Sequence, residues 1–131
     1  MPANIKNFRI DLQEISLINN NLPEGEFTFT PEIRRSVGQV SNIPNNYFVD
    51  ICVDIHDKPE CRFPLNLKVR MVGIFEIENG SHDEIDQFLK LQGFQMVFPH
   101  VRALVANMAS SYLPPILLPI MSANAFEDTI Q

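Results

Sequence analysis

The chain has 131 residues and a mass of 15.0 kDa, with 45% hydrophobic and 20% charged residues. These values are typical of one globular domain and exclude a disordered tail or a collagen-like fibre. Sixteen acidic residues against ten basic ones give a net charge of −6, which argues against binding to nucleic acid or insertion at an anionic membrane surface.

The first two-thirds of the chain shows the alternating pattern of β-strands. Apolar residues occupy the even positions from Phe8 to Leu12 and then switch to odd positions at Ile15 and Leu17. We therefore predict a long strand over residues 6–20 with a bulge or bend near Glu14. A second, less regular strand is expected over residues 26–40, where the proline at position 31 indicates an edge strand or a break.

The clearest alternation covers residues 47–56 and 62–78, on either side of a turn at residues 57–60. It predicts an antiparallel hairpin with one apolar face. Ser81 and Glu84 have the spacing of a capping box, which predicts a helix over residues 82–91 that Gly93 ends. A second helix is expected over residues 98–112, with Pro99 in its first turn. These elements predict one α+β domain over residues 1–131: a four-stranded antiparallel sheet with a long helix packed on one face and short flanking helices.

The sequence contains few features of an enzyme. It has no glycine-rich phosphate loop and no G-x-S-x-G motif, so we expect no cofactor and no nucleotide-driven or hydrolytic activity. Cys52, His56 and Cys61 lie around one predicted turn and offer a thiolate–imidazole pair or half of a metal site. A zinc site needs four ligands and this set is incomplete, so we favour the interpretation of Cys52 as a small apolar strand residue.

The region from residue 103 to residue 126 contains no charged residue. Prolines at positions 114, 115 and 119 interrupt it, so we expect no membrane-spanning helix. We see no secretory signal at the N-terminus and expect a reducing cytoplasm. The ten uncharged residues at 112–121 either pack on their own domain as an extended segment or form one wall of an apolar groove.

Five short sequence blocks occur in a recognisable order. Residues 14–17 read E-I-S-L, residues 73–77 read G-I-F-E-I, and residues 97–102 read V-F-P-H-V-R. Residues 114–119 read P-P-I-L-L-P, and residues 124–127 read N-A-F-E. Together they cover most of the chain, and they resemble blocks of the SecB family of protein-export chaperones, in which F-P-x-x-R opens the long helix.

The resemblance implies a cytoplasmic homotetramer, a dimer of dimers, that holds unfolded polypeptides without ATP, chiefly preproteins for export. It implies that the exposed side of helix 98–112 helps to form the tetramer. It also places apolar grooves between the loop at residues 19–26, the sheet and the segment after the long helix. The candidate peptide-binding residues are Leu22, Phe27, Phe29, Leu113, Ile116, Leu117, Leu118, Ile120, Met121 and Phe126.

The sequence departs from the family pattern on the sheet face where acidic side chains dock the translocase motor ATPase. Glu14 matches one such position and is the candidate docking residue, but Ile18 and Lys68 occupy the positions expected for two more acids. After Phe126 the chain continues only to Gln131, which implies a shortened last helix. The alternatives are a SecB-like chaperone dedicated to the antitoxin of a toxin–antitoxin system, and an interaction module for one folded partner.

Overall fold

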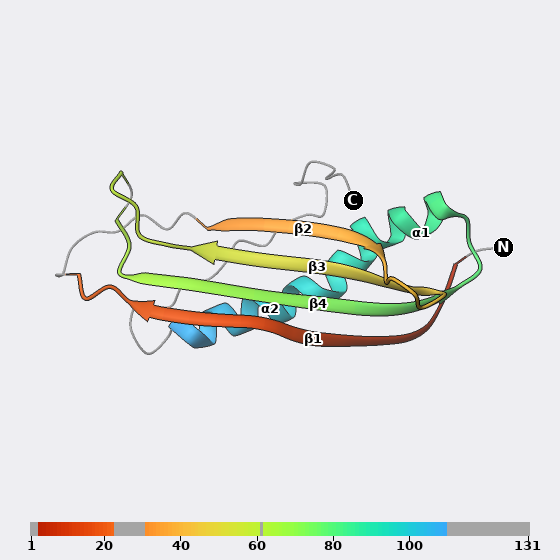
Figure 1. Ribbon diagram of the computed structural model, residues 1–131, viewed down its shortest axis with the longest axis horizontal. Coiled ribbons are helices and arrows are strands. Elements are labelled where there is room, and N and C mark those ends of the chain that lie inside the picture. The colour runs from red at the N-terminus through yellow and green to blue at the C-terminus, as the bar shows by residue number, and fades with distance from the viewer. Residues whose placement is uncertain (1–2, 23–30, 61, 110–131) are drawn as a thin grey trace.

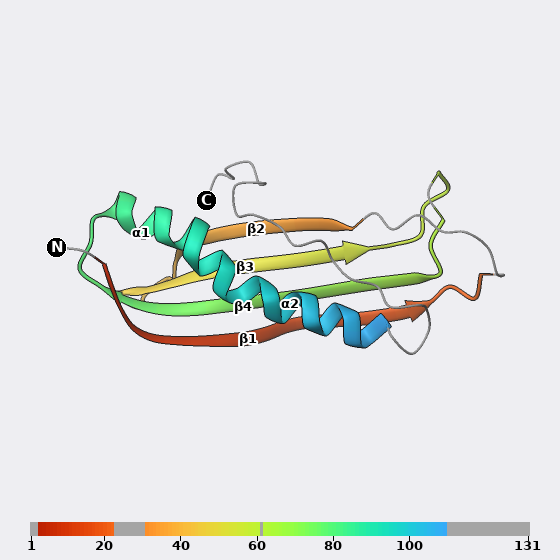
Figure 2. The same ribbon diagram turned by 180° about the vertical axis from the view of Figure 1, so that it is seen from behind.

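The computed structural model describes residues 3–22, 31–60 and 62–109, and these form one sheet and one run of helices. The strands are β1 (Asn4–Asn19), β2 (Glu32–Gln39), β3 (Asn46–Ile55) and β4 (Leu65–Glu78). Their order in the sheet is β1-β4-β3-β2, and all neighbours are antiparallel. The helical run follows β4 and lies on one face of the sheet, whereas none of the described helices covers the other face, called the open face below (Figures 1 and 2). The predicted α+β fold is confirmed.

The core lies between the sheet and the helices. Alternate residues of β3 and β4 point toward the helices and are almost fully buried, as the alternation predicts. On the helical side of the core, Val97, Val101 and Val105 recur at helical spacing, and the buried side chains of Ile85, Leu89, Phe94 and Phe98 lie with them. Gly73 of β4 lies directly beneath this helix, because an added Cβ there would be 2.5 Å from Cγ2 of Val97.

The predicted bulge in the first strand is confirmed. The register between β1 and β4 runs from Leu12 opposite Met71 to Glu14 opposite Arg70, so Gln13 is the extra residue. The bulge absorbs the parity change and returns Ile15 and Leu17 to the face that carries Phe8 and Ile10. β2 begins just after position 31, and it is an edge strand; the first part of the predicted second strand, residues 26–30, lies outside the described residues.

The capping box is also confirmed. The backbone N–H of Glu84 donates to Oγ of Ser81, and α1 (His82–Phe88) begins there. The predicted end at Gly93 is wrong, because the chain continues through a π-helical turn, η1 (Leu89–Gly93), directly into α2 (Phe94–Ala109). Gly93 permits close packing instead, since an added Cβ would lie 3.1 Å from Cγ2 of Val49.

The expected start of the second helix near residue 98 is also wrong. α2 already begins at Phe94, and Pro99 lies inside it on an exposed position. A proline inside a helix costs about 3 kcal/mol, and burial of the neighbouring Val97, Phe98 and Val101 offsets this cost. Residues 110–112 of the predicted helix lie outside the described residues.

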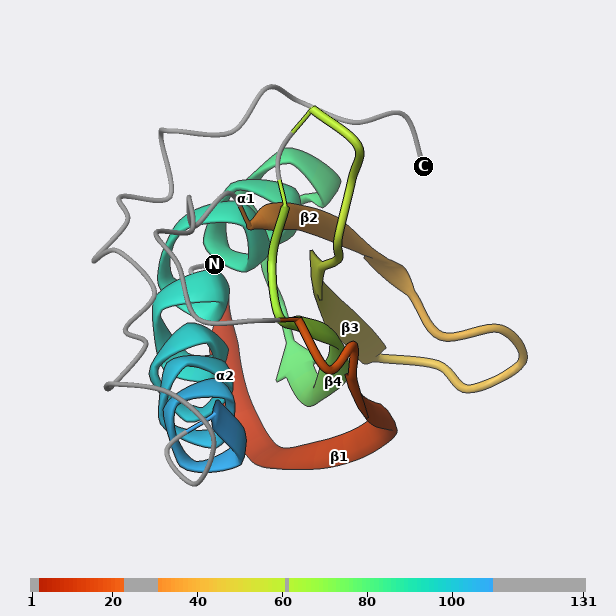
Figure 3. The same ribbon diagram turned by 90° about the vertical axis from the view of Figure 1, so that its left-hand side faces the viewer.

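The π-helical turn is joined to the edge of the sheet by a buried cation. Arg35 of β2 is 6% exposed, and its Nη1 donates to the main-chain carbonyl of Lys90 at 2.7 Å. Its guanidinium lies over the ring of Phe94, 5.9 Å from the centroid. The end view in Figure 3 shows that α1 and α2 lie on the same side of the sheet. Among the described residues, no helix is long and apolar enough to cross a membrane.

Candidate functional site

The structure describes two of the eleven residues that the sequence assigns to binding. Leu22 follows β1 and is half-buried, and Glu14 lies on the open face of the sheet. The other nine lie outside the described residues: Phe27, Phe29, Leu113, Ile116, Leu117, Leu118, Ile120, Met121 and Phe126. The structure therefore places Leu22 and Glu14 relative to the sheet.

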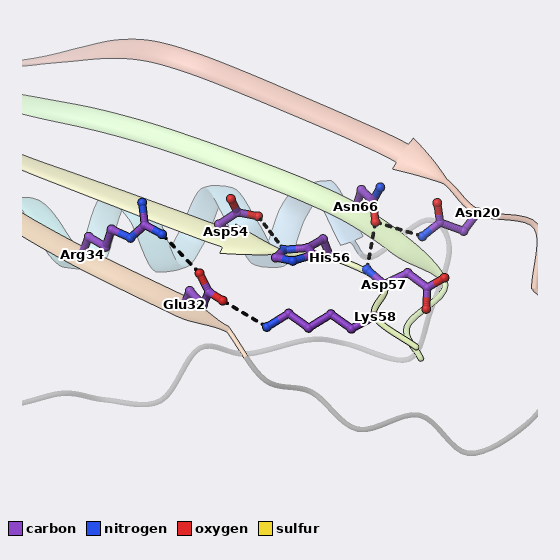
Figure 4. Close-up of polar contacts among 8 residues, drawn as sticks. All are labelled: Asn20, Glu32, Arg34, Asp54, His56, Asp57, Lys58 and Asn66. Carbon is purple, nitrogen blue, oxygen red and sulfur yellow. Dashed lines mark hydrogen bonds and ion pairs between the residues drawn. The ribbon is translucent and has the colours of Figure 1, made fainter. Parts of the chain in front are cut away.

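A network of amide side chains fixes the point at which the chain leaves β1 (Figure 4). The Asn20 side chain donates to Oδ1 of Asn66 and to the carbonyl of Phe63, both at 3.1 Å. The same Oδ1 of Asn66 accepts the backbone N–H of Asp57 at 2.9 Å. The Asn66 side chain thus links the end of β1 to the turn between β3 and β4. This link fixes the position of Asn20, two residues before Leu22.

Ion pairs fix the point at which the chain enters β2, at the same end of the sheet (Figure 4). Glu32 pairs with Nζ of Lys58 at 3.0 Å and with Nη2 of Arg34 at 3.3 Å. The hydrogen bond and charge of Lys58 hold the pKa of Glu32 below its usual value. Asn20 and Glu32, which lie on either side of residues 23–30 in the sequence, are thus both held at the same end of the sheet.

On the helix side, part of β1 is left uncovered. The register places Leu12 opposite Met71 and Ile15 opposite Val69, and both partners are buried in the core. Leu12 and Ile15 are nevertheless 49% and 48% exposed. α2 runs diagonally across this face, and its C-terminal end lies over β1 (Figures 2 and 3). Leu12 and Ile15 therefore present apolar surface on the face of the sheet that carries α2.

Leu12 and Ile15 were not among the residues that the sequence assigned to binding. Their alternation with polar neighbours predicts a core position equally well, and only the diagonal path of α2 shows that the edge strand is incompletely covered. A strand with exposed apolar side chains at a sheet edge is a common feature of interaction surfaces.

On the open face, Glu14 is not an isolated acid. Its Oε1 lies 3.7 Å from Nζ of Lys68, and both side chains are partly exposed. Ile18, further along the same face, is 55% exposed. The nearby Arg70 forms a bidentate pair with Asp50, in which Nη2 and Oδ2 are 2.6 Å apart. This part of the sheet therefore carries paired charges of both signs and not an acidic patch.

The structure separates two members of the cysteine–histidine set. Cys52 and His56 lie four residues apart on the open face, and Nδ1 of His56 faces Oδ1 of Asp54 at 3.2 Å (Figure 4). Burial raises the pKa of the Cys52 thiol, which disfavours a reactive thiolate. Within residues 3–22, 31–60 and 62–109, no three His, Cys, Asp or Glu side chains are placed to hold a metal ion. Cys61 lies outside the described residues.

Comparison with known proteins gives a consistent result. Residues 4–131 match the family model described as preprotein translocase subunit SecB. The chain is 28% identical over 112 residues to the uncharacterized protein MJ0357 of Methanocaldococcus jannaschii, which covers 82% of this chain and 72% of the relative. It is 25% identical over 111 residues to the protein-export protein SecB of Zymomonas mobilis, with 82% and 68% covered.

A solved structure shares the fold. The SecB-like chaperone Rv1957 of Mycobacterium tuberculosis, in complex with a ChAD peptide from the Rv1956 HigA1 antitoxin, superposes with a TM-score of 0.73. The sequence identity is 17%, and the superposition covers 92% of this chain and 91% of that chain. The similarity shows that the four-stranded sheet with its long helix is the SecB-like arrangement.

Proposed function

Because the chain belongs to the SecB family, we propose that it is an ATP-independent holdase that binds unfolded polypeptides, with preproteins for export as its clients. The observation that carries this proposal is the open apolar surface of Leu12 and Ile15 on the helix side, in a chain whose sequence also contains ten uncharged residues at 112–121. Apolar burial contributes about 25 cal/mol per Å² without requiring a particular client sequence. Such surface suits a chaperone that accepts many clients.

We propose that the grooves are formed by the segment containing Leu22, Phe27 and Phe29 on one side and by residues 113–126 on the other. The fixed exit at Asn20 and the fixed entry at Glu32 support this arrangement, because they anchor the first segment at both ends. Anchoring reduces the conformational entropy that the segment loses when a client binds.

We further propose that residues 1–131 act as one domain in a cytoplasmic homotetramer built as a dimer of dimers. The edge position of β1 and the exposure of Ile18 on the open face support a subunit contact along this strand. Several grooves on one particle raise the affinity for a long client through effective concentration.

The holdase proposal is tested by light scattering of insulin reduced with dithiothreitol, whose chains aggregate once separated. The parent protein should suppress aggregation, and the Leu117→Asp/Leu118→Asp variant should require a roughly tenfold or higher concentration, because a carboxylate in an apolar groove costs more than one decade of affinity. Ile43→Asp is the matched control, since Ile43 is a half-exposed residue in the β2–β3 loop, outside the proposed grooves. Failure of the parent to suppress aggregation would contradict the proposal.

A dedicated antitoxin chaperone is the second candidate, and the ion pair between Glu14 and Lys68 favours it over motor docking. A partner that binds acidic side chains would find on this face only Glu14, whose carboxylate is paired with Lys68, beside the apolar Ile18. If this reasoning holds, the parent binds the translocase motor ATPase weakly in isothermal titration, and the Ile18→Glu/Lys68→Glu variant binds it at least roughly tenfold more tightly. Tight binding by the parent would remove this candidate.

A further inference from the structure

The joint between β4 and α1 contains the dipeptide Asn79-Gly80, at the end of the sheet where β1 begins (Figure 1). Asn79 has a φ of 64° and Gly80 a φ of 85°, so two successive residues adopt the left-handed region. Glycine adopts this region at the lowest cost and asparagine visits it more readily than most residues. A Cβ added at Gly80 would lie 3.0 Å from the Cβ of Ala3. The fold therefore favours an asparagine followed by a glycine at this joint.

This dipeptide presents two groups that can react with each other. Asn79 is exposed and Gly80 is partly exposed. Within the described residues, the structure shows no hydrogen bond to the Asn79 side chain or from the backbone N–H of Gly80. Because Gly80 has no Cβ, no side chain of its own obstructs the path from its backbone nitrogen to the side-chain amide of Asn79.

The reaction needs only water. The backbone nitrogen of Gly80 loses its proton and attacks Cγ of Asn79; the N–Cγ bond forms, the Cγ–Nδ2 bond breaks, and Nδ2 takes up a proton and leaves as ammonia. Water then opens the resulting succinimide ring. Opening at Cγ gives aspartate, and opening at the main-chain carbonyl carbon gives isoaspartate, in which the main chain runs through the former side chain. One water is consumed, one ammonia is released, and nothing is oxidised or reduced.

Three other asparagines share this backbone conformation but have a different neighbour. Their φ values lie between 54° and 65°, and a residue with a side chain follows each of them: Asn21, Asn42 and Asn45. Asn42 is the best internal control, because it is exposed like Asn79 and precedes the β-branched Ile43. The backbone conformation is therefore common to all four positions, whereas the following glycine singles out Asn79.

A product at position 79 changes the start of α1. On one side of the joint, Glu78 pairs with Asn4 of β1. On the other side, Oγ of Ser81 accepts the backbone N–H of Glu84 at 3.2 Å and caps α1. Isoaspartate adds one methylene group to the main chain between these two held points, and it adds a carboxylate next to Glu78. The extra length must be taken up by a shift of the strand end or of the helix cap.

We propose that Asn79 is a site of spontaneous deamidation, which converts it in part to isoaspartate and loosens the start of α1. The free α-carboxylate of isoaspartate is the chemical group that S-adenosylmethionine-dependent isoaspartyl carboxyl methyltransferases modify. An enzyme of this class is therefore the partner that fits the altered chain. The reaction uses only Asn79, Gly80 and water, so it does not depend on holdase activity.

The test is incubation of the full chain in mildly alkaline buffer, because the attacking nitrogen must lose a proton. Trypsin then releases residues 71–90, in which Asn79 is the sole asparagine. Tandem mass spectrometry should show conversion at Asn79 at least roughly tenfold faster than at Asn42. An isoaspartyl carboxyl methyltransferase with radiolabelled S-adenosylmethionine should label the 71–90 peptide. Asn79→Gly should abolish this labelling, and it keeps a residue that accepts the positive φ.

Hydrogen exchange tests the effect on the helix. After conversion, the amides of α1 should exchange faster than in the fresh chain, whereas those of β3 should not change. Asn79→Gly, incubated in the same way, should show no such difference. Conversion of Asn79 that occurs only in the urea-unfolded chain, equal rates at Asn79 and Asn42, or unchanged exchange in α1 after conversion would each overturn the proposal.

Discussion

Replacing Gly73 by alanine tests how closely α2 packs on the sheet. The added Cβ would lie 2.5 Å from Cγ2 of Val97, and also 3.2 Å from a ring carbon of Phe75 and 3.3 Å from one of Phe8. The first distance is more than 1 Å shorter than an optimal carbon–carbon contact of about 3.5–4.0 Å. The atoms that the methyl group meets belong to well-packed side chains, so the helix or the strand must move.

The cost follows from overpacking. Inserting a methylene-sized group into a packed core costs about 1–3 kcal/mol, and the usual gain of about 0.5–1 kcal/mol from removing a glycine within a strand offsets part of it. We therefore expect Gly73→Ala to lower the free energy of unfolding by about 1–2 kcal/mol. Val97→Ala alone should cost about 2 kcal/mol, because it removes two buried methyl groups.

The double variant Gly73→Ala/Val97→Ala separates this explanation from a general effect on the strand. With the valine shortened, the new methyl group occupies space that Val97 has vacated, so the double variant should be more stable than the sum of the single effects by at least about 1 kcal/mol. Val105→Ala is the matched control, because Val105 is equally buried but lies about 12 Å further along the helix. Its effect should add to that of Gly73→Ala.

The assay is urea unfolding followed by circular dichroism, at one protein concentration for all variants. The reasoning is refuted if Gly73→Ala is as stable as the parent, or if the effects of Gly73→Ala and Val97→Ala simply add.

Three further predictions concern polar groups. Replacing Arg35 by leucine should cost about 1–3 kcal/mol in urea unfolding, because it removes a hydrogen bond from a charged donor to a part-buried main-chain carbonyl of the π-helical turn; an unchanged midpoint would contradict this. The pKa of Asp57 is lowered from its ordinary value of 3.8 by Arg62 and a backbone N–H, so its stabilising contribution is present above about pH 3.8 and is lost as the pH falls through the lower folded-state value. The stability deficit of Asp57→Asn should therefore shrink in acid, and a deficit that is constant down to pH 2 would be inconsistent with this. In a Cys61→Ser background, alkylation of Cys52 by iodoacetamide should be slower than in the urea-unfolded chain and should rise only above pH 9, because burial raises the thiol pKa from 9.0; equal rates would refute it.

Much of the sheet could be predicted from the sequence, because its signals are local. The parity change after Leu12 predicted the bulge at one of the two positions where the register between β1 and β4 shifts, whereas the shift between Ile5 and Asn7 was not predicted. The capping pair of Ser81 and Glu84 predicted the start of α1. In both cases the physical cause lies within a few residues of the signal, in the pleat of one strand or the first turn of one helix.

The helical run was mispredicted because its cause is tertiary. By local preference Gly93 follows the end of a helix and Pro99 lies in the first turn of the next one, yet both lie inside a continuous run of helix. Contact between Gly93 and Val49, and the donation from Arg35 to the π-helical turn, come from strands that are distant in sequence. Local pattern carries no information about these contacts.

The candidate site was predictable only in part. The family-like blocks indicate the segments that we propose as the walls of the grooves, and of these candidates the structure places Leu22, just after the fixed end of β1. The exposure of Leu12 and Ile15 depends on the diagonal path of α2. It cannot be read from periodicity, because the same alternation describes a covered face and an open one.

The central claim is that the protein holds non-native chains through apolar contact. Isothermal titration of a permanently unfolded client, reduced and carboxymethylated α-lactalbumin, at several temperatures and salt concentrations tests it most directly. The account predicts a clearly negative heat-capacity change and a Kd that varies less than about threefold between about 50 and 500 mM NaCl. A heat-capacity change near zero, with affinity that falls steeply as salt is added, would contradict it.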